Sequence, residues 1–225
     1  MDMKICIIGA GVSGIASAKE FIKKGYHVTI LEKNSSIGGV WLTKSYKDCQ
    51  VQNSKSNYVF SDVNYDENVQ QFPNTSEVLS YLNKVCKKYD IIKRIDFNVE
   101  VKDAHFDIST EQWNIITNNG IYNCNHMIVA SGFYTRRKDL PITNIPKMKV
   151  LYPSDFSPSK KIQTVNPLIF KDKTVVVVGN GPTGCDLATI AFKNGAKSVK
   201  ILYRSNKWIL RRYLWGLFLA EIIIQ

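Results

Sequence analysis

Two glycine-rich turns are the parts of this sequence best suited to chemistry. The first is GAGVSG at residues 9–14, and the second is GNGPTG at residues 179–184. Glycines at this spacing allow a tight turn, a close approach of the backbone to a pyrophosphate, and close packing of a helix on a strand. The N-terminus of the following helix presents free N–H groups and the positive end of its dipole to phosphates. Each turn is therefore a candidate dinucleotide site.

The elements around the first turn are those that a dinucleotide fold requires. The apolar run at residues 4–8 predicts a buried strand, a helical pattern follows the turn until Gly25, and residues 27–31 predict a second strand. Glu32 stands at the carboxyl end of that strand, 18 residues after Gly14. A carboxylate there can accept hydrogen bonds from both ribose hydroxyls. Gly9, Gly11, Gly14 and Glu32 are therefore the predicted binding residues, and the alternative is a glycine-rich turn in an unrelated α/β protein.

A second pair of glycines favours FAD as the nucleotide. Gly38 and Gly39 are followed directly by Val40 and Trp41, just beyond the second strand. Adjacent glycines permit close backbone approach, here to the adenosine–pyrophosphate side of an extended cofactor. Gly39, Val40 and Trp41 join the predicted FAD contacts, although a plain loop has the same composition.

The second turn has a different residue where the first unit has its acid. A β-branched run at residues 173–178 predicts a strand, Pro182 suits the first turn of a helix, and residues 198–203 predict the next strand. Arg204 follows that strand in the place that Glu32 takes in the first unit. An arginine there replaces an acceptor for the 2′-hydroxyl with a clamp for a 2′-phosphate. Gly179, Gly181, Gly184 and Arg204 therefore predict an NADPH site.

The order of these blocks resembles that of the flavin-containing monooxygenases and, more distantly, of the Baeyer–Villiger enzymes. The resemblance runs from Lys4 to about Arg204 and implies FAD, NADPH and O2 as reactants, with a soft nitrogen or sulfur nucleophile as the small-molecule substrate. It also implies that Asn53 lies by the flavin ring and the nicotinamide, as the catalytic residue, whereas the residues alone favour a turn-capping asparagine. The blocks are GAGVSG, ILEKNSSIGGVW at 30–41, VQNSKSNYVFSD at 51–62, Phe72-Pro73, Trp113, VASG at 129–132 and GNGPTG.

The expected fold is α/β, with two Rossmann-like dinucleotide-binding units of which the second is incomplete. An FAD-binding domain is predicted at residues 1–165 and a partial NADPH-binding domain at residues 166–225. Between the two turns, residues 75–89 predict a helix, and residues 95–101, 113–117 and 127–130 predict strands. Residues 160–172 are expected to form the connector.

Two departures from the family pattern keep other functions open. The family motif Phe-x-Gly-x-x-x-His is replaced by PKMKVLY at residues 146–152, and the sequence ends soon after Arg204. A fragment, a split gene product with a partner chain that completes the fold, and a degenerate non-catalytic remnant all fit these departures. A disulfide reductase is a further alternative, but its chemistry needs a dithiol beside the flavin, and the sequence has no CxxC pair.

Composition excludes several other classes. The net charge is +11, and residues 157–225 hold 11 basic residues against 3 acidic ones, so the excess lies around the second turn. We expect no nucleic-acid binding, because aromatic platforms and known reading modules are absent from the sequence. Five scattered cysteines and a longest apolar stretch broken by Gly216 and Glu221 predict a reduced cytoplasmic protein without a structural metal or a transmembrane segment.

Overall fold

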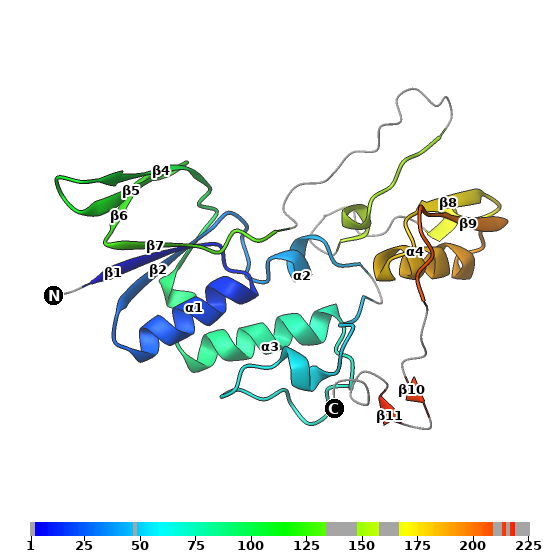
Figure 1. Ribbon diagram of the computed structural model, residues 1–225, viewed down its shortest axis with the longest axis horizontal. Helices are drawn as coiled ribbons and strands as arrows, with labels where there is room; N and C mark the ends of the chain where they lie inside the picture. Colours follow the sequence, from blue (N-terminus) through cyan, green and yellow to red (C-terminus); the bar gives the residue numbers. More distant parts are fainter. Residues whose placement is uncertain are drawn as a thin grey trace. The chain divides into compact units, whose positions relative to one another are not determined.

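The computed structural model describes residues 3–46, 49–133, 148–157, 167–208, 213–214 and 217–218 (Figure 1). The chain divides into two compact units, residues 1–161 and residues 162–225, which are described here one at a time. In the part of the chain that is described, no helix is both long enough and apolar enough to cross a membrane.

A parallel four-stranded sheet forms the centre of the first unit. Its strand order is β3-β2-β1-β7, with β1 at Lys4–Ile8, β2 at His27–Glu32, β3 at Ile95–Phe97 and β7 at His126–Val129. The side chains of Ile5, Ile7 and Ile30 are at most 2% exposed. Such continuous apolar strands are stable only when both faces of the sheet are covered. The covering elements therefore define the first unit.

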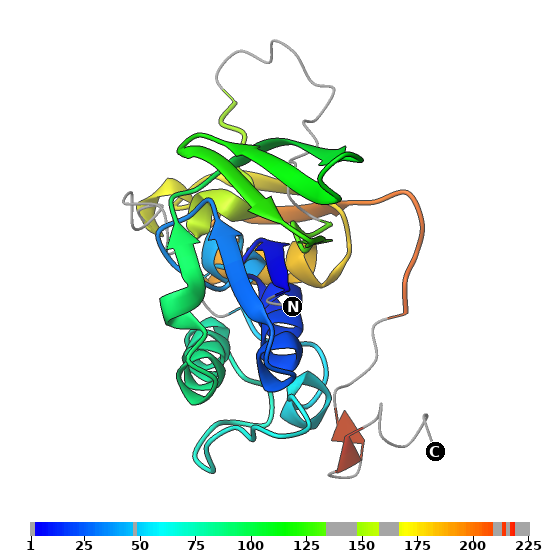
Figure 2. The same ribbon diagram turned by 90° about the vertical axis from the view of Figure 1, so that its left-hand side faces the viewer.

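Two helices cover one face of this sheet (Figure 2). Helix α1 spans Val12–Lys23, and Gly25 follows it with a φ of 81°, as the predicted helix stop requires. Helix α3 spans Thr75–Lys88 and begins at a capping box. There the Asn74 side chain accepts a hydrogen bond from the Glu77 N–H at 3.0 Å, and the Glu77 carboxylate accepts one from the Asn74 N–H at 2.8 Å. The predicted helix at 75–89 is thus present and one residue shorter.

An antiparallel three-stranded sheet lies against the opposite face. It consists of β4 at Val101–Asp107, β5 at Gln112–Thr117 and β6 at Gly120–Cys124. A buried cluster joins the two sheets, and its members are Cys6, Leu31, Val99, Ile115 and Cys124. The short helices of this unit are α2 at Val40–Thr43, η1 at Lys55–Tyr58, η2 at Ile92–Arg94 and η3 at Pro153–Phe156.

The single strand predicted at residues 95–101 is wrong. The structure has two strands there, β3 and β4, because Asn98 takes a positive φ of 60° and turns the chain between the sheets. Asparagine tolerates this left-handed conformation better than most residues. The Asn98 N–H donates to the Asn34 carbonyl at 3.2 Å and the Val99 N–H donates to the Glu32 carbonyl at 3.0 Å, so the turn is fixed to the end of β2.

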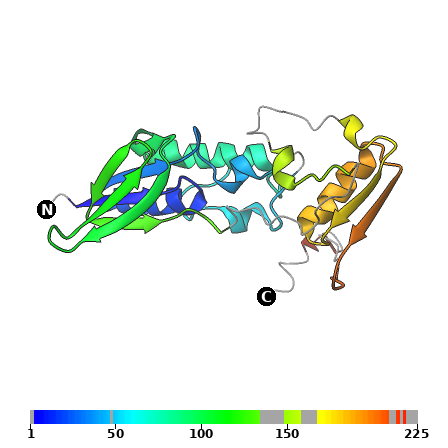
Figure 3. The same cartoon turned by 90° about the horizontal axis from the view of Figure 1, so that it is seen from above.

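The described part of the second unit contains one strand–helix–strand motif. Strands β8 at Thr174–Val178 and β9 at Ser198–Leu202 are parallel, and helix α4 at Pro182–Lys193 connects them and packs on one face (Figure 3). On β8, Val175 and Val177 are half-buried, whereas Val176 and Val178 are more than half exposed. The remaining elements of this unit are η4 at Pro167–Ile169, β10 at Tyr213–Leu214 and β11 at Leu217–Phe218. Residues 160–166 of the connector predicted at 160–172 lie outside the described residues.

Candidate dinucleotide-binding sites

The first glycine turn joins β1 to α1 at the carboxyl edge of the parallel sheet. Gly9 has a φ of 103°, and its N–H donates to the Leu31 carbonyl at 2.8 Å. A Cβ on Gly9 would lie 2.7 Å from the Ala130 carbonyl oxygen, and one on Gly14 would lie 1.9 Å from the Gly9 carbonyl oxygen. Both positions therefore need glycine for the fold itself, as the turn motif predicts for helix–strand packing.

Gly11 is different, because the protein itself would leave room for a side chain. A Cβ on Gly11 would meet only the Gly39 Cα, at 3.6 Å, which is an ordinary contact, and its φ is −79°. The absence of a side chain there keeps the backbone open to an approaching group. This is the property predicted for the glycine that faces a pyrophosphate.

The second glycine pair, Gly38 and Gly39, contacts the first turn. The Gly38 N–H donates to the Ala10 carbonyl at 3.0 Å, and a Cβ on Gly39 would lie 3.1 Å from the Gly11 Cα. Gly39 has a φ of 56° and precedes α2, which begins at Val40. Backbone from two loops therefore meets here without intervening side chains. Trp41, which was also predicted to contact the cofactor, is half-buried in α2.

A cavity of about 830 Å³ lies at this edge of the sheet. Its walls come from the first turn, the end of β2, the glycine pair and two segments that the sequence analysis did not assign to a site. These are residues 99–101, where β3 passes into β4, and residues 130–133, which follow β7. The sequence signal for the second segment is the VASG block at residues 129–132, which the sequence analysis gave as part of the family resemblance without a binding role. The residues predicted from the first turn and its surroundings that line the cavity are Gly9, Gly11, Glu32, Gly39 and Val40.

Glu32 is 4% exposed and holds the first turn in place. Its Oε2 accepts a hydrogen bond from the Ala10 N–H at 2.7 Å, and its Oε1 accepts two from Asn34, at 2.9 Å from the backbone N–H and at 2.6 Å from Nδ2. A carboxylate offers about four acceptor positions. One position, on Oε2, therefore remains for a ribose hydroxyl, and binding of both hydroxyls requires Asn34 to release Oε1.

Asn53 lies outside the residues that line this cavity. It is exposed, and it sits between Val51, whose N–H donates to the Pro73 carbonyl at 3.0 Å, and Ser54, which is fully buried. The structure thus gives Asn53 a fixed backbone and an exposed side chain. Its predicted catalytic role stays a prediction.

The second turn repeats the geometry of the first within its own unit. The Gly179 N–H donates to the Leu202 carbonyl at 2.8 Å, the same distance as from Gly9 to Leu31. A Cβ on Gly184 would lie 2.1 Å from the Gly179 carbonyl oxygen, whereas one on Gly181 would meet nothing within 4 Å. Gly184 and Gly181 therefore correspond to Gly14 and Gly11, whereas Gly179, unlike Gly9, needs glycine only for its φ of 109°.

Arg204 stands at the carboxyl end of β9, beside this turn. The side chain of Asn180, within the turn, donates from Nδ2 to the Ser205 carbonyl at 3.0 Å and so fixes the residue next to Arg204. Arg204 is exposed, and so is Lys207. Leu31 and Leu202 are equivalent, because each accepts the hydrogen bond from the first glycine of its turn, so the residue equivalent to Glu32 is Tyr203. Arg204 lies one residue further on, so the second unit has a positive charge near the place where the first has an acid.

The fold and its glycine turns define an α/β protein with Rossmann-like dinucleotide-binding units, so the predicted fold class is confirmed. Residues 2–224 match the family model described as "FMO-like: Flavin-binding monooxygenase-like". The chain belongs to this family, as the resemblance of its sequence motifs implied.

Curated relatives match nearly the whole chain. Flavin-containing monooxygenase 3 of Homo sapiens is 29% identical over 98% of this chain and 44% of its own length. Flavin-containing monooxygenase 2 of Homo sapiens is 31% identical over 94% of this chain and 42% of its own length. The chain therefore spans less than half the length of these curated relatives.

Two solved structures share the fold. A structure of OTEMO in complex with FAD and NADP superposes with a TM-score of 0.79 at 25% identity, over 92% of this chain and 39% of that one. S-allyl-L-cysteine S-oxygenase from Allium sativum superposes with a TM-score of 0.76 at 22% identity, over 95% of this chain and 54% of that one.

Proposed function

We propose that this chain forms the FAD-binding region and part of the NADPH-binding region of a flavin-dependent monooxygenase. The observation that carries the proposal is the pair of equivalent turns with an acid beside one and an arginine beside the other. The acid suits the unphosphorylated ribose of FAD, and the arginine suits the 2′-phosphate of NADPH. Under this proposal residues 1–165 are the FAD domain, residues 166–225 belong to the NADPH domain, and Asn53 lies by the reacting rings.

The residues that line the first cavity suit FAD. Gly11 and Gly39 leave the pyrophosphate side free of side chains, and the first turn of α1 supplies N–H groups beside it. Glu32 offers an acceptor to the ribose. Bound FAD, with NADPH as reductant, would supply the activation of O2, and the protein would bind it, orient it and exclude water.

The substrate we propose is a soft nitrogen or sulfur nucleophile. One relative is named "Dimethylaniline monooxygenase [N-oxide-forming] 2", from Cavia porcellus, and one structural neighbour is an S-oxygenase. A substrate of this type needs no acid–base pair from the protein, because the cofactor carries the reactive oxygen. A cytoplasmic location and a partner chain that completes the fold stay predictions.

The alternative functions are a disulfide reductase and a degenerate remnant. A disulfide reductase needs a reactive dithiol beside the flavin, but burial raises the pKa of Cys86 to about 12, and hydrogen bonding to Cys124 together with burial raises the pKa of Cys6. None of these cysteines lines the first cavity.

A degenerate remnant would keep the fold without turnover. The departure at residues 146–152, of which 148–152 are described as irregular chain, is what favours this second alternative.

A matched pair of alanine variants tests the cofactor assignment. Gly11 and Gly181 are both helix N-caps with nearly equal φ values, −79° and −76°, and neither added Cβ would clash with the protein. Gly11→Ala should therefore fold and weaken FAD binding at least tenfold, with little effect on NADPH. Gly181→Ala should weaken NADPH binding and leave FAD binding unchanged.

Flavin absorbance and fluorescence titrations of the purified chain measure both affinities. Bleaching of the bound flavin by NADPH, compared with NADH, then tests the enzyme itself. Wild-type protein that is folded but takes up no FAD would refute the proposed function. FAD binding without any reduction by NADPH would favour the remnant.

A further inference from the structure

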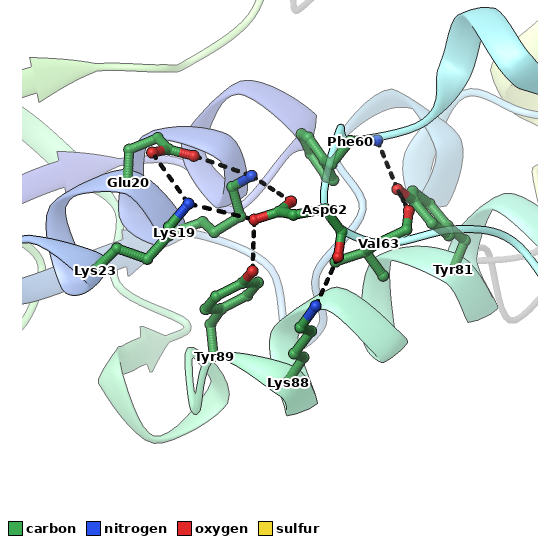
Figure 4. A network of polar contacts seen from close by, with 9 residues as sticks. All are labelled: Lys19, Glu20, Lys23, Phe60, Asp62, Val63, Tyr81, Lys88 and Tyr89. Atoms are coloured by element: carbon green, nitrogen blue, oxygen red, sulfur yellow. Dashed lines mark hydrogen bonds and ion pairs between the residues drawn. The ribbon is translucent and has the colours of Figure 1, made fainter.

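Lys19 is a buried cation on α1 that the glycine turns do not explain. Its side chain is 4% exposed, and its Nζ lies 2.7 Å from Asp62 Oδ1 and 2.9 Å from Glu20 Oε1 (Figure 4). The same ammonium group lies over the rings of Phe60 and Tyr89, 5.1 and 5.8 Å from their centroids. A buried charge is tolerated only when it is paired in this way.

Asp62 accepts hydrogen bonds from side chains of α1 and from the C-terminal end of α3. Its Oδ2 accepts a hydrogen bond from the Tyr89 hydroxyl at 2.5 Å, and its backbone carbonyl accepts one from Lys88 Nζ at 2.6 Å. Lys23 of α1 lies 3.4 Å from the same carboxylate. Asp62 is therefore the one residue of Figure 4 that bonds to side chains of both α1 and α3.

The protonation states of this cluster favour a permanent ion pair. The hydrogen bonds from Lys19 and then from Tyr89 hold the pKa of Asp62 well below its usual range. Burial lowers the pKa of Lys19, but its hydrogen bonds to Asp62 and Glu20 outweigh burial, and the net pKa is raised. Both groups consequently stay charged at neutral pH.

Asp62 lies at the tip of the segment that carries Asn53, residues 50–74. The base of this segment is closed by the hydrogen bond from Val51 to Pro73, and Lys55 Nζ donates to the Val69 carbonyl at 2.6 Å. At the tip, the Tyr81 hydroxyl donates to the Val63 carbonyl and accepts from the Phe60 N–H, both at 2.7 Å. These contacts join the segment to α3, and Asp62 joins it to α1.

Helix α1 links this cluster to the cofactor cavity. The helix begins at Val12, which lines the cavity together with Gly11 and Ser13. Lys19 lies seven residues further along the same helix, a rise of about 10 Å. Because a helix of this length behaves as a rigid element, Lys19 and the N–H groups at the turn keep a fixed spacing.

We propose that Asp62 is a positioning residue. Its bonds to Lys19 and Tyr89 set the place of the Asn53 segment relative to the pyrophosphate turn, and so the place of Asn53 relative to the flavin. The inference rests on the proposed function. A purely structural anchor would change stability alone, whereas a positioning residue also changes the flavin environment and the rate of its reduction.

Asp62→Asn tests the proposal with Asp66→Asn as its matched control. Asp66 belongs to the same segment and pairs with Lys84 at 2.5 Å, but it is 64% exposed and contacts α3 alone through this pair. Both substitutions remove one carboxylate charge and keep the side-chain shape. Tyr89→Phe, which removes one hydrogen bond from Asp62, replaces Asp62→Asn if that variant fails to fold.

Three measurements on the purified chain separate the outcomes. Hydrogen exchange without cofactor should rise in residues 50–62 of Asp62→Asn and stay unchanged in β1 and β2. With FAD bound, the visible absorption band should shift while the dissociation constant changes less than about threefold. Reduction by NADPH should slow at least tenfold, since a displacement of about 1 Å costs roughly a hundredfold in rate.

The results that contradict the inference are distinct from those that contradict the proposed function. If Asp62→Asn matches Asp66→Asn in spectrum and reduction rate, the positioning role is wrong while the monooxygenase proposal stands. If wild-type protein takes up no FAD, the proposed function is wrong, and the positioning role, which rests on it, is wrong as well. Equal exchange of residues 50–62 in both variants would also overturn the inference.

Discussion

Replacement of Gly14 by alanine should destabilise the first unit, although alanine is the better helix former. A Cβ at Gly14 would stand 1.9 Å from the Gly9 carbonyl oxygen, so α1 and the turn must separate by about 1 Å. Such overpacking costs about 1–3 kcal/mol. Distortion of the hydrogen bond from Gly9 to Leu31 adds about 1 kcal/mol. The gain in helix propensity, about 1 kcal/mol, offsets part of this cost.

The net expectation is a loss of about 1–3 kcal/mol in the free energy of unfolding. Urea denaturation of the cofactor-free chain measures it, with Gly11→Ala as the control, because the Cβ at Gly11 makes only an ordinary contact at 3.6 Å. The reasoning would be refuted by a Gly14→Ala midpoint equal to or above that of Gly11→Ala. Such a result would show that α1 does not pack on the turn as the structure has it.

Three further predictions concern other parts of the chain. Arg204→Ala should weaken NADPH binding by about 1.5–3 kcal/mol, the usual loss of a charged hydrogen bond, and leave NADH binding unchanged in a fluorescence titration. Tyr81→Phe removes the hydroxyl that bonds to Val63 and Phe60, so the free energy of unfolding should fall by about 1–3 kcal/mol in urea denaturation. The pKa of Asp62 is lower in the folded state than in the unfolded state, so its contribution to stability is complete above pH 4–5 and is lost as the pH falls below about 4. Wild-type protein should therefore lose more thermal stability between pH 5 and 3 than Asp62→Asn, and parallel melting curves of the two would contradict the pairing.

The sequence predicted the elements whose residues are constrained by short-range geometry. The turn at residues 9–14, helix α1 and its end at Gly25 follow from glycine conformation and apolar periodicity, and all are present. The second turn follows in the same way from residues 179–184. Local rules were sufficient here because the contacts that fix these elements lie within a few residues or between adjacent strands.

The sequence did not predict the features that depend on tertiary contacts. Strand β4 was missed because its residues are mostly exposed or half-exposed and show no clean alternation of apolar and polar side chains. The bond from Ala10 to Glu32 joins residues 22 positions apart, and no local sequence pattern indicates it. The Lys19–Asp62 pair joins residues 43 positions apart, and no periodic pattern indicates it.

The meeting of Gly38 with helix α3 restricts how this family member can vary. A Cβ on Gly38 would lie 2.4 Å from Leu79 Cδ2, the end of a flexible side chain, so the leucine would have to shift. Gly38 also has a φ of 126°, a conformation that no change at Leu79 makes available to other residues. We therefore expect natural variants to retain glycine at position 38 and to have various small or medium apolar residues at position 79. A constant glycine at position 38 beside a variable apolar residue at position 79 is therefore the pattern that we expect in family members that keep this loop.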